Sequence, residues 1–257
     1  MLAVAVGVLG AVTGCSTKGV PYGTPATQSA APTGSATAPT ASAGPLPTAS
    51  MTPLAAATGQ LTGTQLASVL LPASGFPAGF TASSSGPVTS GGSLEVAAAQ
   101  YNLATVSCAD FVEHLGSTGF GETAMAANSV VGADQAYDQV VYQFGSAGSA
   151  SAFVAGLQSL ASRCGTSFSA TDNGTSGTFR LTAKAGADVG GHPTVELVQS
   201  GTVGGTSVVL DTLFSASGVD VFGAAGVGLG TGAPAVPAKE TIVYDLMQRQ
   251  AAAAVLS

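Results

Sequence analysis

The sequence contains no tryptophan, three cysteines and only six lysines and arginines in 257 residues. Charged residues make up 7% of the chain, and 13 aspartates and glutamates give it a formal net charge of -7 at pH 7. Proteins that bind nucleic acid neutralise its phosphates with lysine and arginine. The shortage of basic residues therefore excludes DNA and RNA as expected partners.

Beyond the N-terminal end, the chain has no run of 18 or more apolar residues, so no membrane-spanning helix is expected in its body. Residues 2–12 are apolar but too few to span a bilayer, which predicts a signal peptide over residues 1–14. No lysine or arginine precedes this apolar stretch, although signal peptides open with positive charge. We therefore expect the true start of translation to lie upstream of Met1.

The apolar stretch ends in Val12-Thr13-Gly14-Cys15, which resembles the bacterial lipobox: an aliphatic residue, two small residues and a cysteine. This resemblance implies that Cys15 receives a diacylglycerol and becomes the first residue of the mature chain. The alternative is an ordinary secretory signal with an incidental cysteine. The expected location is the outer face of the cytoplasmic membrane, with the lipid as anchor.

Residues 15–60 are predicted to form a disordered tether. From Ser16 to Gln60, 37 of 45 residues are Ala, Pro, Ser, Thr or Gly, and the segment holds seven of the 13 prolines. Such a segment buries too little apolar surface to offset the entropy of ordering it. As a flexible coil it reaches about 35–40 Å, enough to hold a domain clear of a membrane surface.

Setting Cys15 aside leaves Cys108 and Cys164, an even pair in a chain that we expect to be exported. Disulfides form and persist outside the cytosol, so we predict that these two cysteines are bridged. Two unpaired buried cysteines are the alternative. No CxxC motif or Cys/His cluster suggests a metal or redox site, and no cofactor is expected.

Residues 61–257 are predicted to form a single α+β domain. Capping residues and helical spacing favour helices at 65–71, 108–115, 149–164 and 240–256. Period-two patterns favour strands at 137–144, 178–183, 194–198, 208–214 and 219–222, and a glycine-rich loop is expected at 223–232. Short turns between strands indicate antiparallel pairing, so the expected architecture is an antiparallel sheet with helices packed on one face.

Three stretches carry a resemblance to a known family: LLPASGFPAGF at 70–80, SCADFV at 107–112, and the segment from Tyr142 to Phe168 that contains Cys164. They are similar to the PknH-like extracellular sensor domain, which occurs on receptor kinases and on free lipoproteins of actinobacteria. The resemblance implies an α/β fold with disulfides and a cleft for an unidentified ligand. Only Cys108 and Cys164 carry over, in a structural role. This chain lacks the family's second cysteine pair and its tryptophan.

Candidate catalytic groups are few. On a strand, His192 and Glu196 share one face, which is the start of an acid/base or metal pair. A turn histidine and a solvated carboxylate are the favoured interpretation. The second candidate is Asp134 and Asp138 converging near Glu122, as in a carboxylate pair for glycoside hydrolysis. We expect these acids instead to decorate exposed strand ends.

The remaining motifs favour structural interpretations. Asp172-Asn173-Gly174 begins like a calcium loop but lacks its later ligands, so it predicts a turn. Glycines at 226, 228, 230 and 232 do not have the GxGxxG spacing of a dinucleotide site. No GxSxG motif occurs. We therefore expect neither a catalytic site nor a metal site.

The favoured hypothesis is a lipid-anchored binding or sensor domain at the cell envelope, with a small molecule or an envelope protein as partner. A structural or partner-binding envelope lipoprotein is the alternative, and an unrecognised hydrolase is a lesser one. A binding domain predicts a cleft with a few polar groups in an apolar wall. A partner-binding protein predicts a flat apolar patch instead.

Overall fold

The computed structural model describes residues 51–56, 59–76, 78–83, 88–90, 101–115, 119–132, 135–172, 175–229 and 239–256. Cys15 and the signal peptide predicted at 1–14 lie outside these residues, as does the tether up to residue 50. The helices are α2 (Gly63–Val69), α3 (Cys108–His114), α4 (Ala147–Arg163) and α5 (Lys239–Leu256), with a short 3-10 helix η1 (Ala73–Gly75). The strands are β1 (Thr81–Ala82), β2 (Val88–Ser90), β3 (Glu122–Val131), β4 (Gln135–Phe144), β5 (Phe168–Asp172), β6 (Thr175–Ala185), β7 (Thr194–Val203), β8 (Thr206–Ser217) and β9 (Asp220–Leu229).

All nine described strands form one antiparallel sheet with the order β1-β3-β4-β9-β8-β7-β6-β5, and β2 pairs with β3 beside β1. Sequential hairpins build the β5–β9 part, which agrees with the short turns expected there. The β3–β4 hairpin then joins this part through β4 and β9. The predicted α+β class and antiparallel sheet are confirmed.

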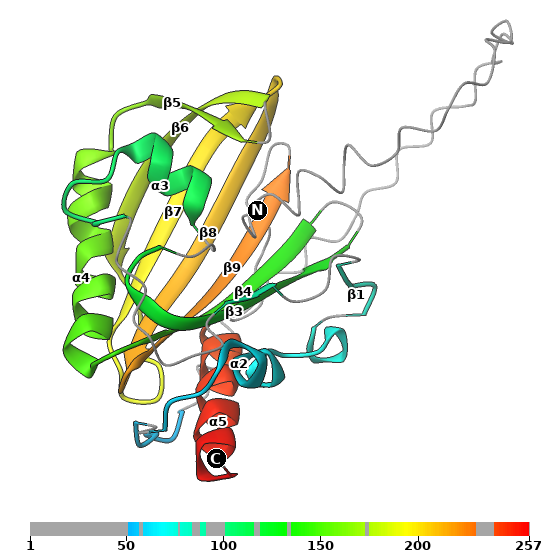
Figure 1. The fold of residues 1–257 in the computed structure, drawn as a ribbon. Helices are drawn as coiled ribbons and strands as arrows, with labels where there is room; N and C mark the ends of the chain where they lie inside the picture. The colour runs from blue at the N-terminus through cyan, green and yellow to red at the C-terminus, as the bar shows by residue number, and fades with distance from the viewer. Residues whose placement is uncertain are drawn as a thin grey trace, which may run out of the picture.

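The helices cover both faces of this sheet, rather than the single face that we predicted (Figure 1). Helices α3 and α4 pack on one face, where Met125, Tyr142 and Phe214 point. Helices α2 and α5 pack on the other, where Val141 and Phe222 point. Central strands that are buried on both faces read as continuous apolar runs, and β3 is buried at nearly every position. This is why the pattern there did not predict a strand or the second helical layer.

Phe153 of α4 is the centre of the core on the α3/α4 face. Its ring lies 5.4 Å from that of Tyr142, 5.5 Å from that of Phe144 and 5.6 Å from that of Phe120. Ser146 caps α4 by accepting a hydrogen bond from the Ser149 backbone, three residues before the predicted start. The helical spacing of Phe153, Val154 and Leu157 buries all three against the sheet, as expected.

Two glutamines of β4 fasten the α2 segment to the opposite face. The Leu71 backbone donates to Gln139 Oε1 at 2.8 Å, and Gln139 Nε2 donates back to the Leu71 carbonyl at 2.7 Å. Gln143 Oε1 accepts from the Leu61 backbone at 2.8 Å, while its Nε2 donates to Asp220 at 3.0 Å. Leu61 and Leu71 lie outside helix and strand, so their backbone groups have no secondary-structure partners, and the two buried amides supply hydrogen bonds instead.

Part of the segment assigned to the tether contacts the folded domain. The Leu54 backbone donates to the Gly190 carbonyl at 3.0 Å, and the hydroxyl of Tyr244 on α5 donates to the Thr52 carbonyl at 3.2 Å. Met51 and Leu54 also pack against the α2/α5 core. The packed part of the chain therefore begins before residue 61, the predicted boundary.

The predicted glycine-rich loop at 223–232 is wrong in its first half, because β9 continues to Leu229. Gly223 faces the α3/α4 side, where a Cβ atom would lie 2.7 Å from Val140 Cγ1 and 2.8 Å from Phe214 Cε1. The neighbouring strands carry large side chains into the space that this glycine leaves. Glycine here permits close packing within a strand, rather than a turn.

Candidate functional site

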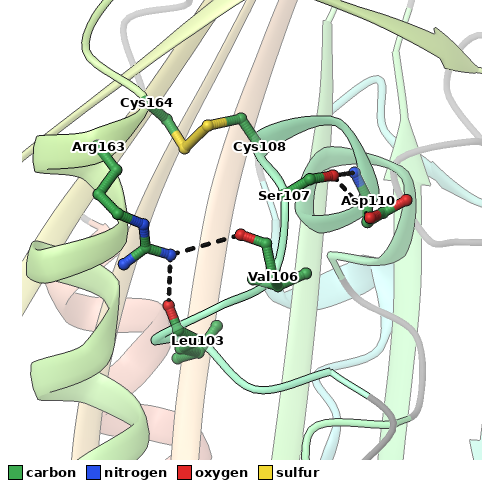
Figure 2. The surroundings of a disulfide bond; sticks show 7 residues. All are labelled: Leu103, Val106, Ser107, Cys108, Asp110, Arg163 and Cys164. Atoms are coloured by element: carbon green, nitrogen blue, oxygen red, sulfur yellow. Dashed lines mark hydrogen bonds between the residues drawn. A yellow bond between two sulfur atoms is a disulfide. The ribbon is translucent and has the colours of Figure 1, made fainter.

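A disulfide joins the helices on one face of the sheet. Cys108, the first residue of α3, is bonded to Cys164, which directly follows α4 (Figure 2). Their Cα atoms are 5.6 Å apart. The bridge predicted from the cysteine count is present, and it ties α3 to α4 and to the adjacent β5 edge of the sheet.

Arg163 supports the same junction. Its Nη2 atom donates to the Leu103 carbonyl at 2.7 Å and to the Val106 carbonyl at 3.4 Å (Figure 2). Ser107 caps α3 by accepting from the Asp110 backbone at 3.1 Å, and its hydroxyl donates to the Asp110 carboxylate at 2.6 Å. The guanidinium is therefore committed to backbone carbonyls beside the disulfide.

A band of four buried polar side chains crosses the α3/α4 face of the sheet. Side chains alternate between the faces of a strand, so two residues that are two positions apart share a face. Each band residue is two positions from a core residue of the α3/α4 face, namely Ala127, Val140, Leu210 or Leu197. The polar band consists of Ser129 on β3, Asp138 on β4, Thr212 on β8 and Gln199 on β7. Their exposed fractions are 6%, 8%, 4% and 8% respectively.

The strand register places these side chains near one another. Ser129 lies opposite Asp138, Asp138 opposite Ala225, and Ala225 opposite Thr212. Thr212 lies opposite Leu197, and Gln199 is two residues further along β7. A small alanine therefore separates Asp138 from Thr212, and Gln199 is diagonal to Thr212.

Two acceptor atoms of the polar band have no hydrogen-bond partner among the described residues. They are Asp138 Oδ1 and Gln199 Oε1, both fully shielded from solvent. Burial raises the pKa of Asp138 from 3.8 to about 7, although a hydrogen bond with Ser129 opposes this shift. A buried polar atom without a hydrogen bond lowers the stability of the folded state, so each such atom needs a physical explanation.

None of the basic side chains in the described part of the chain neutralises Asp138. Arg163 donates to the carbonyls beside the disulfide, and Arg249 donates to the Ser68 and Val69 carbonyls. On β6, the core residues Phe179 and Leu181 point to the α3/α4 face. Arg180 and Lys184 point to the opposite face, because side chains alternate along a strand. Lys239 pairs with Glu196 and Asp211.

Of the two acids proposed with Asp138, Glu122 does not join it. Glu122 lies opposite Phe144, six residues from Asp138 along β4, or about 20 Å at strand spacing. Its carboxylate accepts hydrogen bonds from the Gly119 and Phe120 backbones, both at 2.8 Å. Burial raises the pKa of Glu122 against these hydrogen bonds. Asp134 lies outside the described residues.

His192 and Glu196 do not form an acid/base pair. His192 Nε2 lies 3.1 Å from the Leu54 carbonyl and 3.2 Å from Ser217 Oγ. A nitrogen that donates to a carbonyl has no lone pair left to accept the serine proton, so His192 is not placed as a base for Ser217. The turn interpretation fits its place in the Val189–His192 bridge.

Glu196 belongs to an ion-pair cluster on the α2/α5 face. Its carboxylate lies 3.0 Å from Lys184 Nζ and 3.1 Å from Lys239 Nζ, and Lys239 also pairs with Asp211. Burial favours a higher pKa for Glu196, but the two lysines reverse this and hold the pKa below 4.5. Burial raises the pKa of Asp211 against the effect of Lys239. The cluster anchors the start of α5 to the sheet.

Asp220 is another buried acid with a raised pKa, and it lies on the α2/α5 face. Burial raises the pKa of Asp220 from 3.8 to about 7, against a hydrogen bond from Gln143. Its Oδ2 atom has no hydrogen-bond partner within the part of the chain that is described. The described residues hold no group of three His, Cys, Asp or Glu side chains that would bind a metal ion.

The calcium-loop-like motif at residues 172–174 begins at the end of a strand. Asp172 ends β5 and lies opposite Thr175 of β6, so it borders a hairpin connection as expected. Asn173 and Gly174 are outside the described residues. Within the part of the chain that is described, no helix is long and apolar enough to cross a membrane.

Sequence reasoning did not identify Ser129, Thr212 or Gln199. Their signal is a polar residue at an inward position of an otherwise apolar period-two pattern. That signal becomes readable only when the register shows which face is inward.

No protein-family model matches the chain, and no curated protein matches it in sequence. Among solved structures, the extracellular domain of PknH from Mycobacterium tuberculosis is similar with a TM-score of 0.50 and 17% identity. The match covers 74% of this chain and 96% of that one. An uncharacterized protein from Mycobacterium smegmatis matches with a TM-score of 0.37 and 13% identity, over 75% of this chain and 97% of that one. The first of these likenesses shows that the two chains share a fold.

Proposed function

We propose that this chain is an exported, lipid-anchored binding or sensor domain that acts without catalysis at the cell envelope. The observation that carries the proposal is the polar band, where Asp138 and Gln199 each hold an unpaired acceptor atom away from solvent. Buried polar groups of this kind can have their hydrogen bonds completed by a bound ligand, ion or water. The shared fold with an extracellular domain of PknH supports an extracellular location.

The anchor is the lipid on Cys15, and residues 16–50 act as the spacer that holds the domain away from the outer face of the cytoplasmic membrane. The lipobox-like sequence before Cys15 and the proline-rich composition after it support this arrangement. A sensor domain that a lipid holds at the outer face of the membrane passes its signal to another envelope protein. An envelope partner is therefore expected in addition to the ligand.

Native mass spectrometry of the full chain, extracted in mild detergent from the producing organism, tests the binding function. We expect a reproducible small-molecule adduct that is lost on unfolding and is absent from the Asp138→Leu variant. A clean protein mass for the folded wild-type chain, with all of its partners found by crosslinking to be proteins, would favour the alternative of a partner-binding lipoprotein.

Membrane fractionation tests the anchor separately. The wild-type chain is expected to stay in the membrane fraction after a wash that removes peripheral proteins, and the Cys15→Ala chain is expected to be released. Retention of the Cys15→Ala chain would contradict lipid anchoring and leave the binding function untouched.

A further inference from the structure

Strand β6 is longer than its outer neighbour β5, which leaves part of the sheet edge open. β6 runs over Thr175–Ala185, but β5 pairs only with its residues 175–179. Beyond that point the Leu181 backbone donates to the Cys164 carbonyl at 3.0 Å, and no other described strand lies beside residues 180–185 on this side. We call residues 180–185 the β6 edge.

Backbone groups of the β6 edge point away from the sheet. The Gly186 backbone donates to the Thr194 carbonyl on the β7 side, whereas the Leu181 backbone donates to the opposite side. Backbone direction alternates along a strand, so the N–H and C=O groups of Ala183 and Ala185 point outward with those of Leu181. No described backbone group pairs with them. The edge therefore offers two donors and at least two acceptors to an added strand.

The side chains of the β6 edge leave it accessible. Arg180, Thr182, Lys184 and Ala185 are exposed, and the Lys184 side chain is 69% exposed. Lys184 pairs with Glu196, but Glu196 also pairs with Lys239, so Lys184 can turn to another acid without leaving Glu196 unpaired. A strand added here would meet solvent-exposed groups rather than a packed core.

The charge of the β6 edge favours an acidic partner. Arg180 and Lys184 both point to the α2/α5 face of β6, and among the described residues the Arg180 guanidinium has no hydrogen-bond or ion-pair partner. The other described basic side chains are committed to backbone carbonyls or to the Lys239 ion pairs. In a chain with a net charge of -7, this edge is a local excess of positive charge.

The same charge disfavours two other occupants. A second copy of the chain that paired edge to edge would place four cations on one face of a short ladder, which opposes pairing. The predicted tether, residues 16–50, contains no Asp or Glu. A peptide from another protein is therefore the better match.

The pleat of β6 sets the pattern of that peptide. A residue opposite Ala183 or Ala185 exchanges backbone hydrogen bonds with it and points its side chain to the α3/α4 face, where Ala183 packs against the core. The residues between point to the face of Arg180 and Lys184. Acidic residues at every second position, with apolar residues between them, satisfy both faces.

We propose that the β6 edge binds an extended peptide segment of a partner protein in which acidic and apolar residues alternate. The segment lies beside β6 and continues the sheet past Cys164, a mode of recognition in which backbone hydrogen bonds supply affinity and side chains supply specificity. This surface is separate from the polar band. It serves the protein partner rather than the small molecule.

The test uses the full chain in detergent and three fluorescent six-residue peptides: TEVEVT, TKVKVT and TEPEPT. Binding is measured by fluorescence anisotropy at low salt. We expect TEVEVT to bind. TKVKVT should bind at least about tenfold more weakly, because it reverses two ion pairs. TEPEPT should also bind at least about tenfold more weakly, because it keeps the acids but lacks the N–H donors opposite Ala183 and Ala185.

Two variants locate the peptide on the edge. Ala185→Pro removes an outward N–H that the fold does not use, and it should weaken TEVEVT by at least about fivefold. Arg180→Gln should weaken it by about two- to fivefold, as for an exposed ion pair. Thr171→Pro is the matched control, because the Thr171 N–H also points outward but belongs to the edge of β5, and it should leave binding unchanged.

Equal binding of TEVEVT and TKVKVT would overturn the proposal, as would no binding of TEVEVT to a wild-type chain shown by thermal unfolding to be folded. Full binding by a folded Ala185→Pro chain would do so too, and a loss confined to Thr171→Pro would place the peptide on β5 instead. A dimer that Ala185→Pro dissociates would identify a second copy as the occupant. None of these outcomes affects a small-molecule adduct that depends on Asp138.

Discussion

Removal of the disulfide is expected to lower the free energy of unfolding by about 4 kcal/mol. Cys108 and Cys164 are 56 residues apart in sequence, and the chain-entropy model gives about this value for a loop of that length. For a domain of this size, the loss corresponds to a fall in Tm of about 8–16 °C.

The folded state should survive this change, which makes the loss measurable. Arg163 holds the Leu103 and Val106 carbonyls without the bridge, and Ser107 still caps α3. The helix α4 is buried along Phe153, Val154 and Leu157. Most of the lost stability should therefore come from the greater freedom of the unfolded chain.

Urea unfolding of the full chain in a Cys15→Ala background measures the effect, because that background leaves only the two bridged cysteines. The oxidised chain is compared with the same chain in reductant and with the Cys108→Ala/Cys164→Ala variant. Both changes should give the same loss and a larger urea dependence, since the reduced unfolded chain exposes more surface. A loss below about 1 kcal/mol in both, with full folding retained, would refute the loop-entropy reasoning.

Three further predictions concern packing, pH and the N-terminal boundary. Gly223→Val should destabilise the domain by about 1–3 kcal/mol or more in urea unfolding, because its side chain would overlap Val140 and Phe214, whereas Gly148→Ala at an open helix position should be neutral or stabilising. The pKa values of Asp138 and Asp220 are raised from 3.8 to about 7, so between these pH values the folded state binds more protons than the unfolded state. These two carboxyls therefore favour folding more at pH 5 than at pH 8. Asp138→Asn and Asp220→Asn should each reduce this difference in the free energy of unfolding, and an unchanged pH dependence would contradict the burial argument. A chain that begins at residue 61 should unfold at lower urea than one that begins at residue 48, because it lacks the Leu54 contacts with Gly190 and His192; equal midpoints would show that residues 51–54 add no stability.

Local sequence patterns predicted the helices that have regularly spaced apolar residues and capping residues at their ends. The spacing of Phe153, Leu157 and Leu160 indicated α4, and the apolar face of Ile242, Val243 and Leu246 indicated α5. Cysteine pairing followed from an even count in an exported chain. These features depend on neighbours in sequence, which a single chain displays directly.

Features that depend on long-range contact were not predicted. β3 is rich in alanine and buried on both sides, so no alternation reveals it. The glycines of β9 were interpreted as a loop, whereas at Gly223 the side chains of Val140 and Phe214 from neighbouring strands fill the space that a side chain would need. Asp138 was considered as an exposed strand-end acid, whereas the register places it inward beside Ser129. Its burial follows from partners that lie far away in sequence.

The pairing of β4 with β9 also bears on the order in which the chain assembles. Tyr142 lies opposite Val221, so these central strands meet only after almost 80 intervening residues have been made. Until then, one edge of the β3–β4 hairpin offers unpaired backbone groups and apolar side chains to other molecules. Contacts of such long sequence separation form slowly. A newly made chain therefore passes through an aggregation-prone intermediate in which the sheet is incomplete. A chaperone that binds residues 122–144 would protect this intermediate until β9 pairs with β4.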